Sequence, residues 1–482
     1  MRKKIITITF LFLTTLALVA CKKKSTTKTN DKTKVTTATP TTTEHVHEFG
    51  EWKEKVRATC SEDGLKTRSC ACGLVQFEVI PKADHTLVND KCTVCGFEHL
   101  TDGFNIYYSE LDEMYHIDDY TGESTTVRIP RYYDDGENGE HKIFIDKIVE
   151  DDEIESKIKD VNIKKIIIGD GYQTIDENMF LGLNNLEEVV IEGSVMKIGS
   201  KAFYNCPNLS KITFNEDLEQ IGFYAFGSCN FTEIKLPYDL KVLGIGAFSD
   251  NVNLTTVTYY NSSKITEINE NAFNNTALTS IKLNYGLTTF GYQANMPNLT
   301  TFIIDPRNTK FEFEDGCLVD LEAKRLIKAI GKPEIPSTVT ILGQYSLANL
   351  DYSDVDFVVP SNIQYISFNA FSGSTFKSFT ISNGTKVLDE CALSGIDLID
   401  YETIEIVLPS SIQYILFHAF KGLKCKKLTI PESVTYLGYA VFEDCEIEEI
   451  VVYQSTLDSP NCDDFWDYGI DLDYTTVTII YD

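Results

Sequence analysis

From residue 161 onward, apolar residues recur in one fixed order: an apolar residue, two variable positions, an apolar residue, one variable position and a further apolar residue. Two copies are Phe231-Thr-Glu-Ile-Lys-Leu and Cys425-Lys-Lys-Leu-Thr-Ile. Such alternation of apolar and polar positions predicts a β-strand with one buried face. The order begins at Ile163 and predicts a last strand within Tyr474–Ile479.

A second phrase accompanies each strand and ends on an aromatic residue, as in Ile198-Gly-Ser-Lys-Ala-Phe, where the glycine predicts a tight bend. A repeat of about 20 to 29 residues is that of leucine-rich repeats. Because one repeat cannot bury its own apolar edge, we predict a solenoid with a parallel strand ladder of about a dozen rungs and a continuous core, in which Phe226 is a core residue. The aromatic slot recurs in two blocks at Phe180, Phe203, Phe226, Phe248 and Phe273, and at Leu347, Phe371, Leu393, Phe420 and Phe442.

These copies closely resemble the BspA-like leucine-rich-repeat surface proteins of bacteria. The residues after Asp305 look like that family's hairpin insertion, and Tyr115–Pro130 resembles its N-terminal cap. The resemblance covers roughly residues 103–482 and implies an adhesin or scaffold at the cell surface, although a fold by itself does not fix a function. The resemblance divides the chain from residue 100 onward into an N-terminal cap (100–160), a solenoid (161–455) with an insertion near 305–336, and a C-terminal cap (456–482).

The variable strand positions should point outward and form an extended surface. Such a surface suits an extracellular protein or a glycan better than a small-molecule substrate. Tyrosines in another repeat slot form a second candidate edge, because tyrosine is favoured at contact surfaces. Strand propensity explains the Thr and Val residues equally well, and core packing explains the tyrosines equally well. The candidate contact residues are Lys235, Thr258, Lys282, Ile303, Thr380 and Thr429 on the strands, and Tyr365, Tyr414 and Tyr436 at the edge.

The start of the chain predicts export and a membrane anchor. Residues 1–20 join a basic start to an apolar run that is too short and too rich in threonine to span a bilayer, as in a secretory signal peptide. Leu18-Val-Ala-Cys21 resembles the bacterial lipobox, which implies a lipid on Cys21; an ordinary secretory signal is the alternative. The Thr- and Lys-rich residues 21–44 predict a flexible tether. We therefore expect a lipid-anchored protein on the extracellular face of the bacterial cell membrane.

Charge and cysteine placement restrict the chemistry. The formal net charge of -29 argues against nucleic acid as a partner, because phosphate backbones are bound through Lys and Arg. Residues 45–99 are polar and carry two cysteine pairs with zinc-ribbon spacing, which predicts a small module with structural zinc. A disulfide framework is the alternative, weakened because five cysteines cannot all pair within the module. The expected ligands are Cys70, Cys72, Cys92 and Cys95, with Cys60, His47 and His85 as competing ligands or parts of a second site.

The remaining cysteines and histidines favour a binding protein over an enzyme. Cys206, Cys229 and Cys445 share a slot three residues after the repeat phenylalanine, where a small apolar filler fits. We interpret His418, alone in its repeat slot, as exposed and inert. The chain has no His-Glu-x-x-His, no Gly-x-Ser-x-Gly and no phosphate-binding glycine loop. The alternatives are a metal-dependent enzyme or metal-handling lipoprotein centred on residues 45–99, and a structural envelope spacer.

Overall fold

The computed structural model describes residues 48–481 apart from 61, 72–73, 95–97, 134–140, 146, 151–152, 157, 159–160, 261 and 471–473. The chain divides into two compact units, one ending at Phe97 and the other beginning at Glu98. The predicted signal peptide and tether, with Cys21 and His47, lie outside the described residues. Within the described part of the chain, no helix has the length and apolar composition needed to cross a membrane.

The first unit is a small antiparallel β structure with few buried side chains. Its sheet consists of β1 (Lys53–Val56), β2 (Gly64–Ser69) and β3 (Val75–Ile80), and its hairpin of β4 (Leu87–Val88) and β5 (Lys91–Cys92). On β3, Phe77 is 66% exposed. Among the described residues of this unit, the buried hydrophobic side chains are those of Cys70 and Cys92. So small a core needs a cross-link or a metal ion to be stable.

The second unit begins with a cap that supplies the first strand of the solenoid. The cap contains β6 (Phe104–Ser109), β7 (Met114–Tyr120), β9 (Tyr132–Tyr133), β10 (His141–Ile145), β11 (Lys147–Glu150) and β12 (Glu153–Ser156). A further strand, β8 (Thr126–Ile129), pairs in parallel with β13 (Lys165–Ile168), the first repeat strand. Arg128 on β8 is 3% exposed and donates hydrogen bonds to Glu98 (2.8 Å) and Glu192 (2.9 Å). An ion cluster around the buried Arg128 therefore joins the cap to the repeats.

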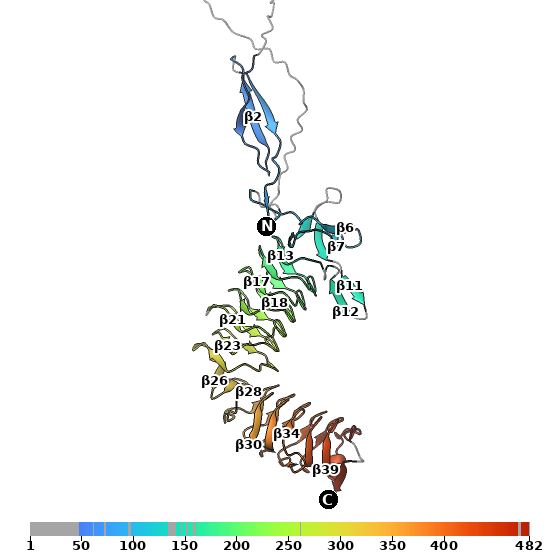
Figure 1. The fold of residues 1–482 in the computed structure, drawn as a ribbon. Helices are drawn as coiled ribbons and strands as arrows, with labels where there is room; N and C mark the ends of the chain where they lie inside the picture. The colour runs from blue at the N-terminus through green and yellow to red at the C-terminus, as the bar shows by residue number, and fades with distance from the viewer. Residues whose placement is uncertain are drawn as a thin grey trace, which may run out of the picture. The chain divides into compact units, whose positions relative to one another are not determined.

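The strands predicted from the repeats form the first parallel ladder (Figure 1). Copies pair in register, with Lys165 opposite Glu188 and Glu405 opposite Lys427. After β13 the first block contains β15 (Glu188–Ile191), β17 (Lys211–Thr213), β19 (Glu233–Lys235), β21 (Thr256–Thr258), β23 (Ser280–Leu283) and β25 (Thr301–Ile304). The second block contains β30 (Asp351–Val359), β32 (Thr375–Ile381), β34 (Asp397–Leu398), β35 (Glu405–Val407), β37 (Lys424–Thr429) and β39 (Glu446–Tyr453).

Where the sequence predicted only a bend, the structure adds a second parallel ladder. Two residues of each copy pair with the next copy, as Gln220 does with Val242. The first block contributes β14 (Thr174–Ile175), β16 (Lys197–Ile198), β18 (Gln220–Ile221), β20 (Val242–Leu243), β22 (Glu267–Ile268) and β24 (Thr289–Phe290). The second block contributes β29 (Ile341–Leu342), β31 (Tyr365–Ile366), β33 (Val387–Leu388), β36 (Tyr414–Ile415) and β38 (Tyr436–Leu437). The apolar core lies between the two ladders.

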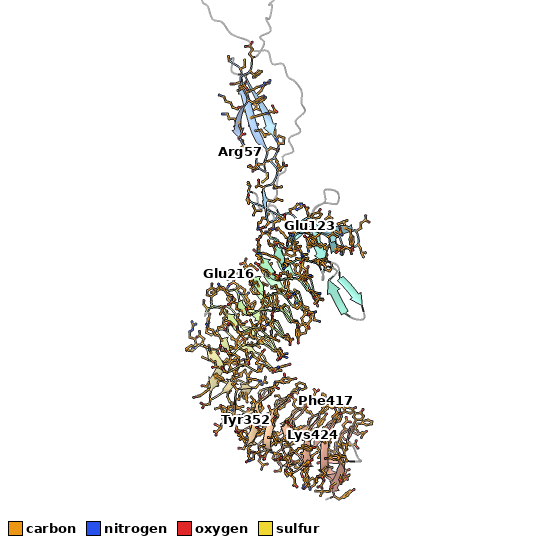
Figure 2. The ribbon with its side chains drawn as sticks, in the orientation of Figure 1. Arg57, Glu123, Glu216, Tyr352, Phe417 and Lys424 are labelled. Carbon is orange, nitrogen blue, oxygen red and sulfur yellow. The ribbon has the colours of Figure 1, made fainter. Side chains whose placement is uncertain are left out.

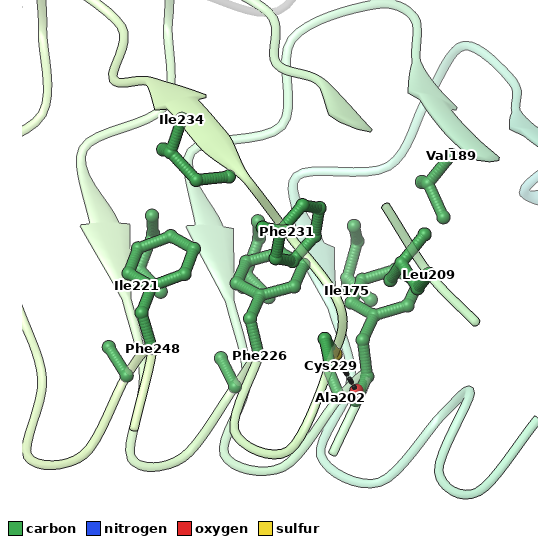
Figure 3. Close-up of a cluster of buried hydrophobic side chains, with 14 of the residues drawn as sticks. Ile175, Val189, Ala202, Leu209, Ile221, Phe226, Cys229, Phe231, Ile234 and Phe248 are labelled. Carbon is green, nitrogen blue, oxygen red and sulfur yellow. Dashed lines mark hydrogen bonds between the residues drawn. The ribbon is translucent and has the colours of Figure 1, made fainter. Parts of the chain in front are cut away.

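The aromatic slot stacks ring on ring along the first block. Phe226 is fully buried, and its ring centroid lies 5.2 Å from that of Phe203 and 5.3 Å from that of Phe248, with nearly parallel planes. Figure 3 shows Phe226 and Phe248 in successive turns of the chain. The prediction that Phe226 is a core residue is therefore confirmed.

The cysteine slot carries a hydrogen-bond donor as well as a small side chain. The buried Cys229 thiol donates to the carbonyl oxygen of Phe203 (3.2 Å), the contact dashed in Figure 3. Asn251, in the same slot one copy later, donates to the carbonyl of Phe226 (2.8 Å). Burial raises the pKa of Cys206, also in this slot, to about 12. These thiols therefore stay protonated and bond one rung to the next.

The insertion forms a wall across the solenoid, and the prediction of a continuous core is wrong. The wall consists of β26 (Phe311–Glu314), β27 (Cys317–Asp320) and β28 (Arg325–Ala329), which are antiparallel, and β28 pairs in parallel with β29. Successive strand residues point to opposite faces. Leu318 and Ile327 consequently pack into the core of the first block, whereas Cys317, Val319 and Leu326 pack into that of the second. Because both faces of the wall are apolar, it separates two hydrophobic cores.

The solenoid ends on an added strand, as the sequence predicts. A short helix, α1 (Gln454–Leu457), follows β39, and the chain returns as β40 (Thr476–Ile480). This strand pairs in parallel with β39, Val477 lying opposite Ile450. The last repeat strand therefore has a paired edge.

Candidate functional site

The variable positions of the first ladder lie at the surface. On β19, Ile234 is 3% exposed while its neighbours Glu233 and Lys235 are exposed. The strand face is therefore open to a partner, and its role in binding stays a prediction. Of the predicted contact residues on the strands, Lys235, Thr258, Ile303 and Thr380 are exposed, and Lys282 and Thr429 are half-buried.

Tyrosines and cations gather where the strands of the first block end. We call this surface the tyrosine–cation patch; it comprises Lys235, Tyr238, Tyr260, Lys264, Tyr285 and Arg307. The ammonium of Lys235 lies 5.4 Å from the ring centroid of Tyr260, and the guanidinium of Arg307 lies 4.6 Å from that of Tyr285. Each such contact stabilises an exposed pair by about 0.5–1 kcal/mol. The cations therefore help to hold the rings in place.

The repeat register builds this patch. Tyr238, Tyr260 and Tyr285 follow β19, β21 and β23 by two or three residues, so consecutive copies bring them to consecutive rungs. The ring centroids of Tyr238 and Tyr260 are 6.3 Å apart. The amide of Tyr238 donates to the carboxylate of Glu216 (3.1 Å), labelled in Figure 2. The contact residues predicted from the sequence do not include these tyrosines, although a tyrosine after each of three successive strand phrases is visible in the sequence.

Two cations of the patch are paired with carboxylates. Lys264 lies 2.7 Å from Asp239, and Arg307 lies 2.9 Å from Asp305. Hydrogen bonds from Arg307 lower the pKa of Asp305 to about 2. Lys235 contacts the Tyr260 ring and forms no ion pair with the described residues. Its charge is therefore available to an acidic group of a partner.

The predicted tyrosine edge lies on the second ladder, and one member borders a cleft. Tyr414 is 44% exposed, so core packing does not explain it; Tyr365 and Tyr436 are half-buried. Tyr365 lines a cleft of about 560 Å³ between β24 and β28, together with Arg325 and Asp389. Burial and a hydrogen bond with Asp389 raise the pKa of Tyr365 to about 12. Its hydroxyl is therefore neutral at physiological pH.

In the first unit, three of the predicted ligand residues come together. One ligand atom each of Cys60, His85 and Cys92 lie within 4.8 Å of one another. The sulfurs of Cys60 and Cys92 are 3.5 Å apart. Two thiolates on one tetrahedral zinc ion, each with a bond of about 2.3 Å, lie about 3.8 Å apart. Sulfur and imidazole donors at this separation fit a zinc ion.

The other predicted ligands are placed differently. Cys70 was expected to share an ion with Cys92, but it is not part of the Cys60–His85–Cys92 group. Its backbone forms an isolated antiparallel β-bridge with Phe49, and its amide donates a hydrogen bond to the carbonyl of Leu74 (2.8 Å). The structure therefore groups Cys92 with the residues treated as competing ligands. The predicted ligands His47, Cys72 and Cys95 lie outside the described residues.

Comparison with known families identifies the repeats. The family model described as a BspA-type leucine-rich-repeat region matches residues 155–259, 327–448 and 399–462, which together make up half of the chain. The chain belongs to the BspA-type leucine-rich-repeat family. No curated protein matches it.

Solved structures of bacterial leucine-rich-repeat proteins resemble this BspA-type chain. A leucine-rich cell surface protein from Faecalibacterium prausnitzii A2-165 is 21% identical, with a TM-score of 0.53 over 75% of this chain and 96% of that one. The pneumococcal vaccine antigen PcpA is 21% identical (TM-score 0.42; 73% and 82% covered). A leucine-rich-repeat protein from Bacteroides ovatus ATCC 8483 is 16% identical (TM-score 0.33; 80% and 100% covered). The first likeness shows a shared fold.

The tyrosine–cation patch extends beyond the matched BspA-type repeats. Lys235 and Tyr238 lie within the first matched segment, which ends at residue 259. The rest of the patch, from Tyr260 to Arg307, lies between the first and second matched segments.

Proposed function

We propose that this BspA-type protein is a non-enzymatic binding scaffold that holds an extracellular protein or a glycan at the tyrosine–cation patch. The observation that carries the proposal is a row of three tyrosines on successive rungs, Tyr238, Tyr260 and Tyr285, which are 38%, 47% and 48% exposed. Tyrosine and arginine are enriched where proteins bind partners, because rigid rings offer large contact areas at a small entropy cost.

One cation of the patch favours a partner with an acidic group. Lys235 has no carboxylate among its described contacts, and the ammonium of Lys282 lies 5.7 Å from the ring centroid of Tyr259 on the same face. Attraction between exposed charges is screened by salt, with a Debye length of about 8 Å at physiological ionic strength. Binding should therefore weaken as salt is added, while the part due to the tyrosine rings should persist.

The test compares patch variants of the purified protein on immobilised matrix glycoproteins and on an array of neutral and acidic glycans. Replacing Tyr260 and Tyr285 together by alanine should weaken binding at least about tenfold, since central aromatic residues often contribute 2 kcal/mol or more. Replacing Lys235 and Lys282 by glutamate should weaken binding at low salt and have less effect at high salt, with the fold intact.

The matched control is Lys197→Glu, which makes the same kind of charge change at an exposed position of the second ladder. It should leave binding unchanged. If the tyrosine and lysine variants bind every probe as well as the wild type does, the patch is not the site. The edge of Tyr365, Tyr414 and Tyr436 is then the next surface to test.

We also propose that the protein is displayed on the extracellular face of the bacterial cell membrane through a lipid on Cys21. The lipobox-like sequence and the tether after it support this proposal. The Faecalibacterium prausnitzii protein of similar fold is described as a cell surface protein, which also supports it. The 23 residues after Cys21, residues 22–44, have a typical reach of about 25 Å, enough to lift the folded part off the lipid headgroups.

For the first unit we propose a structural zinc ion held by Cys60, His85 and Cys92. The sequence offers Cys95, from the Cys92-Thr-Val-Cys95 pair, as the fourth ligand. Four protein ligands close the coordination shell, so the ion would stabilise the unit and bind no substrate. In small zinc peptides such binding contributes on the order of 10 kcal/mol to folding, which suits a unit whose buried hydrophobic residues, as described, are Cys70 and Cys92.

Elemental analysis and thiol titration of protein purified without chelator test the zinc proposal. We expect Cys60→Ser to lose one equivalent of bound zinc relative to the wild type, and Cys462→Ser, at a half-buried cysteine of the second unit, to lose none. Chelation should expose the thiols of residues 45–99 and leave the solenoid's circular dichroism unchanged. Metal-free protein in which these cysteines do not react until a reductant is added would show a disulfide framework instead.

A further inference from the structure

The register of the second ladder brings a cysteine and a histidine together on the solenoid. β33 pairs in parallel with β36, Leu388 lying opposite Ile415. Counting three residues onward from each member of this pair gives Cys391 and His418. Both occupy the left-handed slot of the repeat turn, with φ of 52° and 56°. Two consecutive rungs therefore present a thiol and an imidazole at the same position.

A carboxylate completes the group. Among the described residues, one ligand atom each of Glu390, Cys391 and His418 lie within 4.8 Å of one another, and all three residues are half-buried. The ring centroid of the His418 imidazole lies 5.5 Å from that of Phe417, which Figure 2 labels, and 5.9 Å from that of Tyr439.

The charges around the group leave a place for a cation. Lys421 lies 2.6 Å from Glu443 and 3.7 Å from Asp444, so its charge is directed to these two carboxylates. Glu443 also lies 3.4 Å from Nε2 of His418, where a carboxylate orients the imidazole. Glu390 has no ion-pair partner among the described residues.

We propose that Glu390, Cys391 and His418 form a metal site for a zinc ion, distinct from the group in the first unit and independent of the tyrosine–cation patch. Thiolate, imidazole and carboxylate are the donors that zinc binds in proteins, and all three are within reach of one ion. Three protein ligands leave a fourth position for water or for a donor from a partner. Because the ligands come from two rungs, the ion also joins these rungs and stabilises the second block.

Cobalt titration of the full chain tests this site, because a thiolate bound to Co²⁺ gives a charge-transfer absorption that oxygen and nitrogen donors do not. The starting variant has serine in place of Cys60, Cys70, Cys72, Cys92 and Cys95, so residues 45–99 offer no thiolate ligand. It should bind one equivalent of Co²⁺ with the thiolate absorption and release it to Zn²⁺. Cys391→Ser should abolish the absorption, while His418→Gln and Glu390→Gln should each weaken binding at least about tenfold.

The control is Cys462→Ser in the same background, which should leave the titration unchanged. Circular dichroism of each variant establishes that it is folded. The proposal is overturned if the starting variant shows no thiolate absorption, or if the absorption survives Cys391→Ser. It is also overturned if the glutamine variants bind Co²⁺ as tightly as the starting variant, because the thiol then acts without the other two ligands.

Discussion

Replacing Phe226 by alanine should destabilise the first block by about 3 to 5 kcal/mol, the usual loss for truncating a buried phenylalanine. The ring is stacked between those of Phe203 and Phe248, and it contacts the rings of Phe214 (5.8 Å) and Phe231 (6.0 Å) edge on. Aromatic pairs add about 0.5–1.5 kcal/mol beyond the buried area, so we expect the upper half of the range. The loss should spread to adjacent rungs, which share interfaces with this one.

Urea unfolding followed by circular dichroism measures this loss. The control is Phe223→Ala in the same copy, where the side chain is 42% exposed and the expected change is within about 0.5 kcal/mol. In a Trp52→Phe background, fluorescence reports Trp466, whose ring lies 6.0 Å from that of Phe442 in the second block. Because the wall separates the two cores, the midpoint of this signal should move little. The reasoning fails if Phe226→Ala costs no more than Phe223→Ala.

Two further predictions concern the wall and the anchor. Lys328 on β28 is 7% exposed, and burial lowers its pKa from 10.5 to about 8. Between pH 8 and pH 10.5 the unfolded chain therefore binds more protons at this lysine than the folded protein does. Stability should therefore rise with pH from about 8 to 10, by up to about 3 kcal/mol. Lys328→Met should remove this rise in urea titrations, and identical pH profiles of wild type and variant would contradict it. Cys21→Ser should move the protein from the detergent phase to the aqueous phase; if the wild type already partitions into water, the lipid anchor is wrong.

Local sequence determined the repeating parts of this protein. The apolar alternation around Ile234 predicts a strand with one buried face, and the recurring aromatic slot predicts that Phe226 stacks between its copies; both are found. The strand near Tyr474–Ile479 is also present, as β40. These features depend on short-range periodicity and on the need of each repeat to bury its apolar edge against the next. The strand can be derived from a single copy, and the stacking of the aromatic slot from the spacing between copies.

Tertiary structure decided whatever depends on how distant segments meet. The insertion strands contain apolar residues at consecutive positions, and only their pairing shows that Leu318 and Val319 face different cores. Cysteine spacing favoured Cys70 with Cys92, whereas the turns of the first unit bring Cys60 and His85 to Cys92.

The candidate sites show the same division. Strand alternation predicts that Lys235 points outward. Its contact with Tyr260 depends on how the turns place neighbouring rungs, which the alternation does not predict. His418, interpreted as inert, meets Cys391 because parallel pairing aligns equal positions of consecutive copies. Side-chain chemistry and local period are properties of the sequence. Which side chains become neighbours depends on strand register and on the path of the turns, and no single repeat encodes either.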